Sequence, residues 1–312
     1  MSGRTGIEWT DATWNTVTGC TKVSPGCAHC YAERITERFH GPGSFEKVIL
    51  HPEKLDEPLH WRKPRRVFVN SMSDLFHEDV PDEFIDRVFA AMALASQHTY
   101  QVLTKRPDRM LSYFGRSLDE RLVRDALVEG TAQNIYAERN PLETDCSLWL
   151  AVHLPLRNIW LGVSVENQRF ADERIPLLLR TPAAVKFISA EPLLGPVCLT
   201  DVKEQIVPEM KGDNHIHINS LRCIVPSHID WVIVGGESGP SARPMQLEWA
   251  RSLRDQCKAT RTAFFMKQLG GVHDKRGNLE DFPVDLRIRE FPKRGETGER
   301  RMEAARKSGM RL

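Results

Sequence analysis

The residues with the clearest chemical potential are three cysteines that lie close together near the start of the chain. Cys20, Cys27 and Cys30 fall within eleven residues, in the sequence CTKVSPGCAHC. The Cys-x-x-Cys pair lets two thiolates reach one metal ion or cluster, and the intervening Ser-Pro-Gly turn can fold Cys20 back toward them. A helix predicted to begin near Ala28 would direct its amide dipoles at this loop and favour thiolate over thiol.

The number of thiol ligands suggests more than one kind of site. A structural zinc site or an electron-transfer [4Fe–4S] cluster normally has four protein ligands, whereas three thiolates on a [4Fe–4S] cluster leave one iron free for another molecule. The main alternative is a zinc site completed by His29 or by a distant cysteine, namely Cys146, Cys198, Cys223 or Cys257. A redox disulfide is a further alternative, although it would not need the third cysteine. The spacing alone leaves these alternatives open.

The elements that must position these thiols are predicted to be buried parallel strands. Short runs rich in β-branched and aromatic residues recur along the chain, and several are continuous rather than alternating, as in strands buried on both faces. The predicted strands are Thr13–Thr18, Arg66–Asn70, Tyr100–Thr104, Ile159–Ser164, Val185–Ser189, Trp231–Val234 and Ala263–Met266.

Helix-like segments lie between these runs and complete a repeated strand–helix pattern. One follows Pro81 and another follows Pro244, and the ranges Ala28–Phe39 and Asn167–Arg180 show the same periodicity less cleanly. Strand and helix alternate six or seven times, which predicts an α/β fold, either a barrel or a doubly wound sheet. Polar residues follow six of the strands, and in parallel α/β folds the carboxyl ends of strands form the site. Helix caps and turns are the alternative explanation for any one of them.

Two stretches depart from the repeat and are predicted to be loop insertions, about 116–157 and 199–228. We therefore expect one α/β domain over residues 1–285, followed by a basic tail at 286–312. The segment Arg287–Leu312 holds nine Lys and Arg residues against four Asp and Glu residues, a local net charge of +5. A basic tail is usually mobile, and contact with phosphates is the alternative.

Composition excludes several classes of protein. Hydrophobic residues make up 41% and charged residues 27% of the 312, which excludes a disordered or fibrous chain. Lys and Arg number 43 against 42 for Asp and Glu, so the chain is not built as a non-specific nucleic-acid binder. We find no secretion signal and no stretch of about 20 apolar residues that could cross a bilayer. These features predict a cytoplasmic protein without a membrane partner, in which clustered cysteines bind metal.

The cysteine loop and the strand pattern together resemble the radical S-adenosylmethionine (SAM) superfamily. That superfamily carries three cysteines in the loop after the first strand of a partial parallel (β/α)6 TIM-like barrel. Its usual spacing is Cys-x3-Cys-x2-Cys, whereas six residues separate Cys20 and Cys27 here. More narrowly, GCTKVSPGCAHCYAE, SAEPLLGPV, DWVIVGGESGPSARPM and FFMKQLGG resemble landmarks of a phage-associated radical-SAM-like family, over most of residues 7–285.

The resemblance implies cofactors, a partner and a reaction. Cys20, Cys27 and Cys30 would ligate a [4Fe–4S] cluster whose free iron binds the amino and carboxylate groups of SAM. Reductive cleavage of SAM would give methionine and a 5′-deoxyadenosyl radical that abstracts hydrogen from a substrate. The electron would come from a reductase of the flavodoxin or ferredoxin type.

The resemblance also implies positions for the remaining site residues, nearly all of them directly after a predicted strand. The glycine-rich form of the loop after the second strand, usual in the superfamily, is absent here. The predicted cofactor-binding residues are His29, Ser71, Asp74, Lys105, Ser164, Glu166, Asn167, Gly235 and Gly236. The predicted catalytic residues are Glu191, Glu237 and Lys267. For the two adjacent glycines, close approach to a ligand and a tight turn both remain open.

The substrate and the rival functions rest on weaker features. The phage association, the basic tail and the strand-end cations Lys105, Arg106 and Lys267 favour a nucleic acid or nucleotide substrate, with a peptide as the alternative. The rivals are a non-catalytic zinc-binding protein and a degenerate radical SAM fold that keeps only its cluster. A second metal site at His215, His217, Cys223 and His228 matches no known ligand spacing, so we expect ordinary loop residues there.

Overall fold

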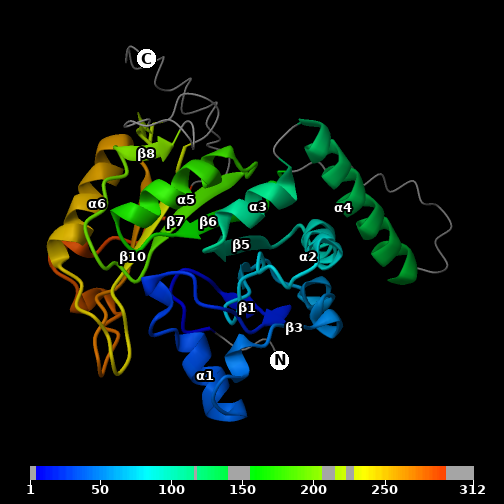
Figure 1. Cartoon of the computed structure of the whole chain (residues 1–312), viewed down its shortest axis with the longest axis horizontal. Helices are drawn as coiled ribbons and strands as arrows, with labels where there is room; N and C mark the ends of the chain where they lie inside the picture. The colour runs from blue at the N-terminus through cyan, green and yellow to red at the C-terminus, as the bar shows by residue number, and fades with distance from the viewer. Residues whose placement is uncertain (1–4, 116–117, 140–154, 206–214, 223–227, 293–312) are drawn as a thin grey trace. The chain divides into compact units, whose positions relative to one another are not determined.

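The structure of the chain is a computed structural model that describes residues 5–115, 118–139, 155–205, 215–222 and 228–292 (Figure 1). The chain divides into two compact units. The first unit holds Met1–Gly162 and Thr181–Ala184, and the second holds Val163–Arg180 and Val185–Leu312. No helix in these described ranges is long and apolar enough to cross a membrane.

Seven strands of the described residues belong to one sheet, in the order β1-β4-β5-β6-β7-β10-β11. The pairs β1–β4, β4–β5, β7–β10 and β10–β11 are parallel. Apart from β1, each strand coincides within two residues with a predicted run, because continuous apolar runs suit strands buried on both faces. The bounds are β1 Ala12–Trp14, β4 Arg66–Val69, β5 Thr99–Thr104, β6 Ile159–Ser164, β7 Val185–Ala190, β10 Trp231–Gly235 and β11 Ala263–Gln268.

The first predicted strand is shorter than expected. β1 ends at Trp14, and Val17–Thr18 forms a separate strand, β2, which pairs antiparallel with β3 at Ile49–Leu50. The break follows from the side chain of Asn70, whose Oδ1 accepts hydrogen bonds from the backbone N–H groups of Thr16 (2.9 Å) and Val17 (3.1 Å). These bonds take the chain out of the parallel ladder and lead it into the cysteine loop.

The first unit contains four α-helices among its described residues, and two of them contact each other through aromatic side chains. The four helices are α1 Tyr31–His40, α2 Asp82–Leu94, α3 Pro107–Phe114 and α4 Leu118–Arg139. Phe89 of α2 packs against Tyr113 and Phe114 of α3, with ring centroids 5.4 and 5.3 Å apart. Short 3-10 turns connect these elements at Pro25–Cys27, Ser44–Glu46, Pro52–Lys54 and Glu57–His60.

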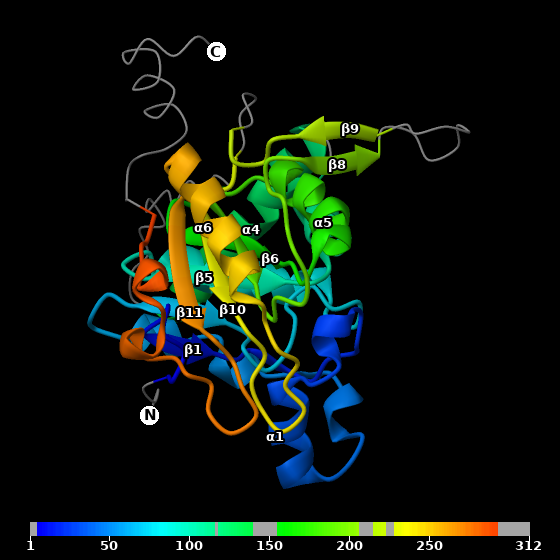
Figure 2. The ribbon, with the colours of Figure 1, turned by 90° about the vertical axis from the view of Figure 1, so that its left-hand side faces the viewer.

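The second unit contains α5 Gln168–Arg180 and α6 Leu247–Thr260, which lie beside its strands (Figure 2). All five residues of β10 are buried, as expected for a strand between β7 and β11. The 3-10 turns Leu279–Asp281 and Val284–Leu286 follow β11. The chain then returns along that strand, because Met266 N–H donates to Ile288 O (2.8 Å) and Glu290 N–H donates to Phe264 O (2.9 Å).

The predicted insertions and tail have the following outcome. The first insertion contains α4, which packs against α2, and the second contains the antiparallel pair β8 Val202–Gln205 and β9 His215–Ile218 (Figure 2). Residues 140–154, 206–214, 223–227 and 293–312 lie outside the described residues. The mixed α/β class with a parallel sheet is confirmed. The six-unit partial barrel and the single-domain boundary at residue 285 stay predictions.

Candidate functional site

The cysteine loop follows β2 and is held in place by backbone contacts within the first unit. Cys20 N–H donates to Phe45 O (2.8 Å), and Gly19 N–H donates to Met72 O (3.2 Å). Gly19 has a φ of +90°, and a Cβ there would lie 2.0 Å from the carbonyl oxygen of Lys47. Only glycine fits this conformation and this close approach, so the residue before the first cysteine is fixed by packing.

The three predicted metal-ligating cysteines lie on this one loop. Cys20, Cys27 and Cys30 carry free thiols, and each residue is partly exposed. Cys27 ends the 3-10 turn Pro25–Cys27, and its Sγ lies 3.8 Å from Ser24 Oγ. Cys30 is the N-cap of α1, which begins at Tyr31 and not near Ala28 as predicted. The positive end of the helix dipole therefore lies at the third cysteine.

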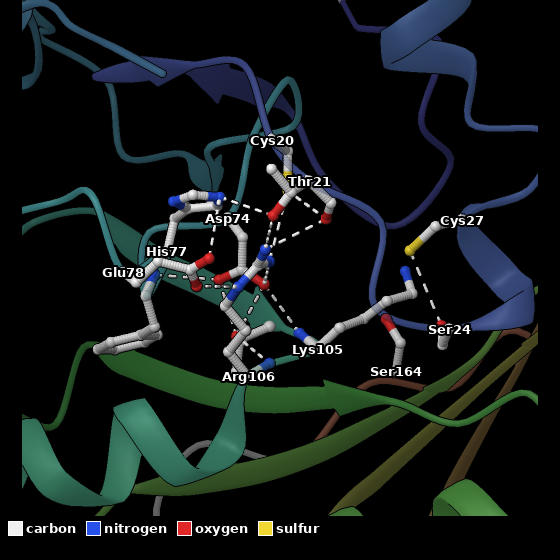
Figure 3. A network of polar contacts seen from close by, with 12 residues as sticks. Cys20, Thr21, Ser24, Cys27, Asp74, His77, Glu78, Lys105, Arg106 and Ser164 are labelled. Atoms are coloured by element: carbon white, nitrogen blue, oxygen red, sulfur yellow. Dashed lines mark hydrogen bonds and ion pairs between the residues drawn. The ribbon is translucent and has the colours of Figure 1, made fainter. Parts of the chain in front are cut away.

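A buried arginine contacts the first cysteine (Figure 3). Arg106 lies between β5 and α3, and its Nη1 is 3.4 Å from Cys20 Sγ. Its Nη2 donates to the carbonyl oxygen (3.1 Å) and the hydroxyl oxygen (2.7 Å) of Thr21. The guanidinium also forms ion pairs with Asp74 (3.5 Å) and Glu78 (3.4 Å). One cation thus connects the cysteine loop with the loop that follows β4.

Asp74 is the buried anchor of this network and is 5% exposed. Its carboxylate accepts hydrogen bonds from Thr104 Oγ1 (2.7 and 2.9 Å), from the Lys105 N–H (2.9 Å) and from the Phe76 N–H (3.0 Å). The resemblance to the radical SAM superfamily predicted Asp74 as a cofactor-binding residue. In the structure its two oxygens are occupied by groups of the protein, and that assignment stays a prediction.

Burial and charge set the protonation of two groups beside Arg106. Burial raises the pKa of the Cys20 thiol to about 11; the negative charge of Asp74 adds to this rise, and the positive charge of Arg106 opposes it. Burial lowers the pKa of His77, and the charge of Arg106 adds to that decrease. The His77 ring is 2.9 Å from Thr21 Oγ1, so this imidazole contacts the cysteine loop, and its lowered pKa favours the neutral form.

In the second unit the strand ends carry a close lysine–glutamate pair. Lys267 Nζ, on β11, lies 2.6 and 2.7 Å from the two carboxylate oxygens of Glu191, which follows β7. Their side chains are 15% and 18% exposed. A Cβ at Gly235 would lie 3.1 Å from the Glu191 carboxyl carbon, so the missing side chain leaves room for this carboxylate.

The other strand-end carboxylates of this unit are also paired. Arg243 donates to Glu237 through its Nε (2.8 Å), its Nη2 (2.6 Å) and its backbone N–H (2.9 Å). Arg174 Nη1 lies 3.0 Å from Glu166, with both side chains buried.

A Cβ at Gly236 would lie 2.0 Å from the Leu269 carbonyl oxygen. Packing of the protein against itself therefore explains this glycine as well.

The remaining predicted residues have simpler surroundings. His29 is exposed, and Ser71 Oγ donates to Asn15 Oδ1 (3.1 Å). Ser164 is 2% exposed, and Asn167 Oδ1 accepts from the Phe170 N–H (3.4 Å), as a helix cap does. The structure therefore brings predicted residues together in two places: Asp74 with Lys105 and, through Arg106, with Cys20 in the first unit, and Glu191 with Lys267 and Gly235 in the second.

Sequence reasoning missed several residues of these networks. Thr21, His77, Arg174 and Arg243 were not predicted, and Arg106 was noted only as a strand-end cation. Arg106 and Thr21 have a usable signal, because one follows a predicted strand and the other follows the first cysteine. Arg174 and Arg243 have none: each lies within eight positions of its carboxylate, but no pattern in the sequence marks the two as partners.

The three cysteine thiols are chemically suited to bind an iron–sulfur cluster. Three free thiols on one loop are the soft ligands that zinc and iron–sulfur clusters prefer. Among the described residues, no group of three or more His, Cys, Asp or Glu side chains is placed to hold one metal ion. A single zinc ion would need its sulfurs within about 4 Å of each other, whereas a cluster takes each thiolate on a different iron.

The second predicted concentration of metal-type ligands has other partners. His217 Nδ1 contacts an Asp201 carboxylate oxygen, and His228 Nε2 lies 3.1 Å from Asp230. Cys223 lies outside the described residues. A second metal site here stays unsupported by the histidine geometry that the structure gives.

Comparison with known proteins assigns the chain to a family. The chain belongs to the family described as "Protein of unknown function (DUF5131)", whose model matches residues 4–308. No curated protein matches. Among solved structures it is similar to a spore photoproduct lyase complexed with a dinucleoside spore photoproduct, at 10% identity and a TM-score of 0.40, covering 84% of this chain and 64% of that one. A cysteine-to-serine mutant of such a lyase has 10% identity and a TM-score of 0.36, covering 85% of this chain and 78% of that one.

Proposed function

We propose that this chain is a radical SAM-like enzyme, and the observation that carries the proposal is the cysteine loop. Three free thiols lie between β2 and α1, the third at the N-cap position of the helix, and the first contacts a buried guanidinium. The sequence segments that resemble landmarks of the phage-associated radical-SAM-like family support the same assignment, as does the order of strand, cysteine loop and helix. When bound, a [4Fe–4S] cluster supplies one electron to SAM, whose sulfur–carbon bond breaks to give methionine and the 5′-deoxyadenosyl radical.

Residues of the first unit would hold the cluster and stabilise its charge. Cys20, Cys27 and Cys30 would ligate three irons as thiolates. The Arg106 cation beside Cys20 favours the thiolate form of that residue, and the positive end of the α1 dipole lies at Cys30. His29, Ser71, Asp74 and Lys105 remain the predicted cofactor contacts of this unit.

Residues of the second unit would act on the substrate. The Glu191–Lys267 pair is partly exposed, so a bound molecule can reach both groups, and the lysine can hold a proton against the carboxylate. Glu237, fixed by three hydrogen bonds from Arg243, would orient a partner without moving. Ser164, Glu166, Asn167, Gly235 and Gly236 stay the predicted SAM contacts here.

The proposed substrate is a nucleic acid or a nucleotide. The local net charge of +5 in Arg287–Leu312 supports an anionic substrate, and Lys105 adds a cation at the end of β5. The other two strand-end cations, Arg106 and Lys267, are ion-paired within the protein, so the polymer proposal depends mainly on the tail. Oligonucleotide binding that weakens as salt rises would support it, and binding indifferent to salt would count against it.

The decisive experiment measures iron, sulfide and zinc per chain after anaerobic cluster reconstitution. We expect about four iron and four sulfide, as a [4Fe–4S] cluster requires. The variant Cys27→Ala should lose iron, whereas Cys198→Ala, which removes an exposed thiol that is not part of the loop, should keep it. The loaded protein, given SAM and dithionite, should release 5′-deoxyadenosine.

The rival functions give different results in the same experiment. A zinc-binding protein would take up stoichiometric zinc and no iron, which would overturn the radical mechanism. A degenerate fold would bind the cluster, lose it in Cys27→Ala, and release no 5′-deoxyadenosine. Equal iron loss from Cys27→Ala and Cys198→Ala would remove the cysteine loop from the proposal.

A further inference from the structure

Arg106 differs from two other largely buried arginines, Arg124 and Arg174, in what its guanidinium contacts. Arg124 donates to Asp82 and Asp86 at 2.8 Å each, and Arg174 pairs with Glu166 at 3.0 Å. Their charges are balanced by close carboxylates. Arg106 is as buried, with an 8% exposed side chain, yet its carboxylates lie farther away, at 3.4 and 3.5 Å. Its shortest contacts are to the cysteine loop.

Those short contacts fix both the position and the electrostatic surroundings of the first cysteine. Nη2 is bound to two oxygens of Thr21, the residue bonded to Cys20, so the loop cannot shift without losing them. Nη1 then lies 3.4 Å from Cys20 Sγ. Asp74 holds the arginine from the other side, and it is itself held by Thr104 and the Lys105 N–H. The cation is therefore fixed from two sides.

We propose that Arg106 is a positioning residue for Cys20 that also raises the reduction potential of the cluster held by this loop. The inference rests on the proposed function and deepens it. A reduced cluster carries one more negative charge than an oxidised one, so a buried cation beside a ligand sulfur stabilises the reduced state. Hydrogen bonds to ligand sulfurs and the net charge around a cluster are the means by which proteins set its potential.

A role confined to folding is the competing explanation, and it makes a different prediction. If Arg106 only joined the cysteine loop to the loop after β4, its removal would lower stability and leave the potential of any cluster that still formed unchanged. The potential is therefore the measurement that separates the two roles. Stability alone does not, because a buried arginine contributes to it in either case.

The test compares the wild-type chain with Arg106→Met, Arg106→Gln and the control Arg124→Met. The control removes an arginine of similar burial, 14% exposed, from the same unit, and this arginine pairs with carboxylates. Each protein is reconstituted anaerobically, assayed for iron and sulfide, checked by far-UV circular dichroism, and titrated with dithionite in the presence of redox mediators. The signal followed is the electron paramagnetic resonance spectrum of the reduced cluster.

We expect both Arg106 variants to have a more negative potential than the wild type, by about a factor of ten in the reduction equilibrium, which is about 59 mV for one electron. Arg124→Met should keep the wild-type potential, and Arg106→Lys should restore part of the shift because it keeps the charge. Loss of iron uptake by folded Arg106→Met, with uptake kept by Arg124→Met, would also support the positioning role.

Three outcomes would overturn the inference. The first is an unchanged potential in Arg106→Met or Arg106→Gln, and the second is an equal shift in Arg124→Met. The third is failure of both Arg106 variants to fold, which would assign the residue to the architecture of the loop. A wild-type chain that takes up no iron would instead overturn the proposed function itself, so the two failures are distinguishable.

Discussion

The two networks at the strand ends use charge in different ways. In the second unit the strand-end carboxylates Glu166 and Glu191 each have a cation of their own, Arg174 and Lys267. In the first unit a single cation, Arg106, is shared between carboxylates and the thiol of Cys20. In a separate pair the two charges neutralise each other, so the pair has little influence on other groups. When a cation is shared, altering one of its partners changes its electrostatic effect on the others. We therefore expect a substitution in the first network to change the pKa of the Cys20 thiol. A substitution in the second network should mainly change the free energy of unfolding.

The largest expected effect tests the most buried pair of the second unit. Glu166→Gln leaves the Arg174 guanidinium buried and without its carboxylate, and we expect the free energy of unfolding to fall by about 3–5 kcal/mol. Urea unfolding of the apoprotein, followed by circular dichroism, measures it. The control Glu173→Gln removes a carboxylate paired with the exposed Arg169 and should cost less than about 1 kcal/mol. Similar costs for the two variants would contradict the assignment of a buried pair.

A smaller effect is expected for the partly exposed pair. A double-mutant cycle with Glu191→Gln and Lys267→Met should give a coupling free energy of about 1–2 kcal/mol, because the two side chains touch and are mostly shielded from water. In the first unit, the Lys22–Glu33 pair has the same residue types at 2.7 Å, with Lys22 54% exposed. Its cycle should give below about 0.5 kcal/mol, since exposed pairs are screened. Equal coupling free energies in the two cycles would show that burial does not determine the strength of these pairs.

The smallest effect concerns the thiol in the first network. The pKa of Cys20 is raised to about 11, so its alkylation in the apoprotein should still increase with pH above about 9, where an ordinary thiol is already largely ionised. Asp74→Asn removes a negative charge that disfavours the thiolate, and it should move the alkylation curve to lower pH. Site-resolved mass spectrometry after iodoacetamide treatment measures it.

The matched control for this titration is Asp108→Asn, which removes an exposed carboxylate two residues beyond Arg106. Its alkylation curve should coincide with that of the wild type. A curve for Asp74→Asn that stays in place, or moves to higher pH, would show that the Asp74 charge does not act on Cys20.

The strands were predictable and the networks were not, for a physical reason. Buried parallel strands consist of consecutive apolar residues, so runs such as that of β10 can be recognised in the sequence. The anchoring of the cysteine loop depends on residues distant in sequence: Cys20 and Arg106 are separated by 86 positions. The split between β1 and β2 was missed because it depends on the side chain of Asn70, which reaches back across the sheet.

The glycines illustrate the same limit. Adjacent glycines at 235 and 236 are visible in the sequence, but their neighbours are not. The structure places the Glu191 carboxylate against the first and the Leu269 carbonyl oxygen against the second. The sequence pattern thus located the strand end, but only the packing explains why a side chain is disfavoured at each glycine.

The return of residues 286–292 along β11 has a consequence for the chain in solution. An open final strand offers unpaired N–H and C=O groups to a strand of another molecule, which is a route to aggregation. Here Ile288 O and the Glu290 N–H occupy β11, and the indole N–H of Trp231 donates to Glu290 O (2.9 Å). This segment therefore shields the edge from intermolecular pairing, and a chain shortened before residue 286 would expose a self-association surface.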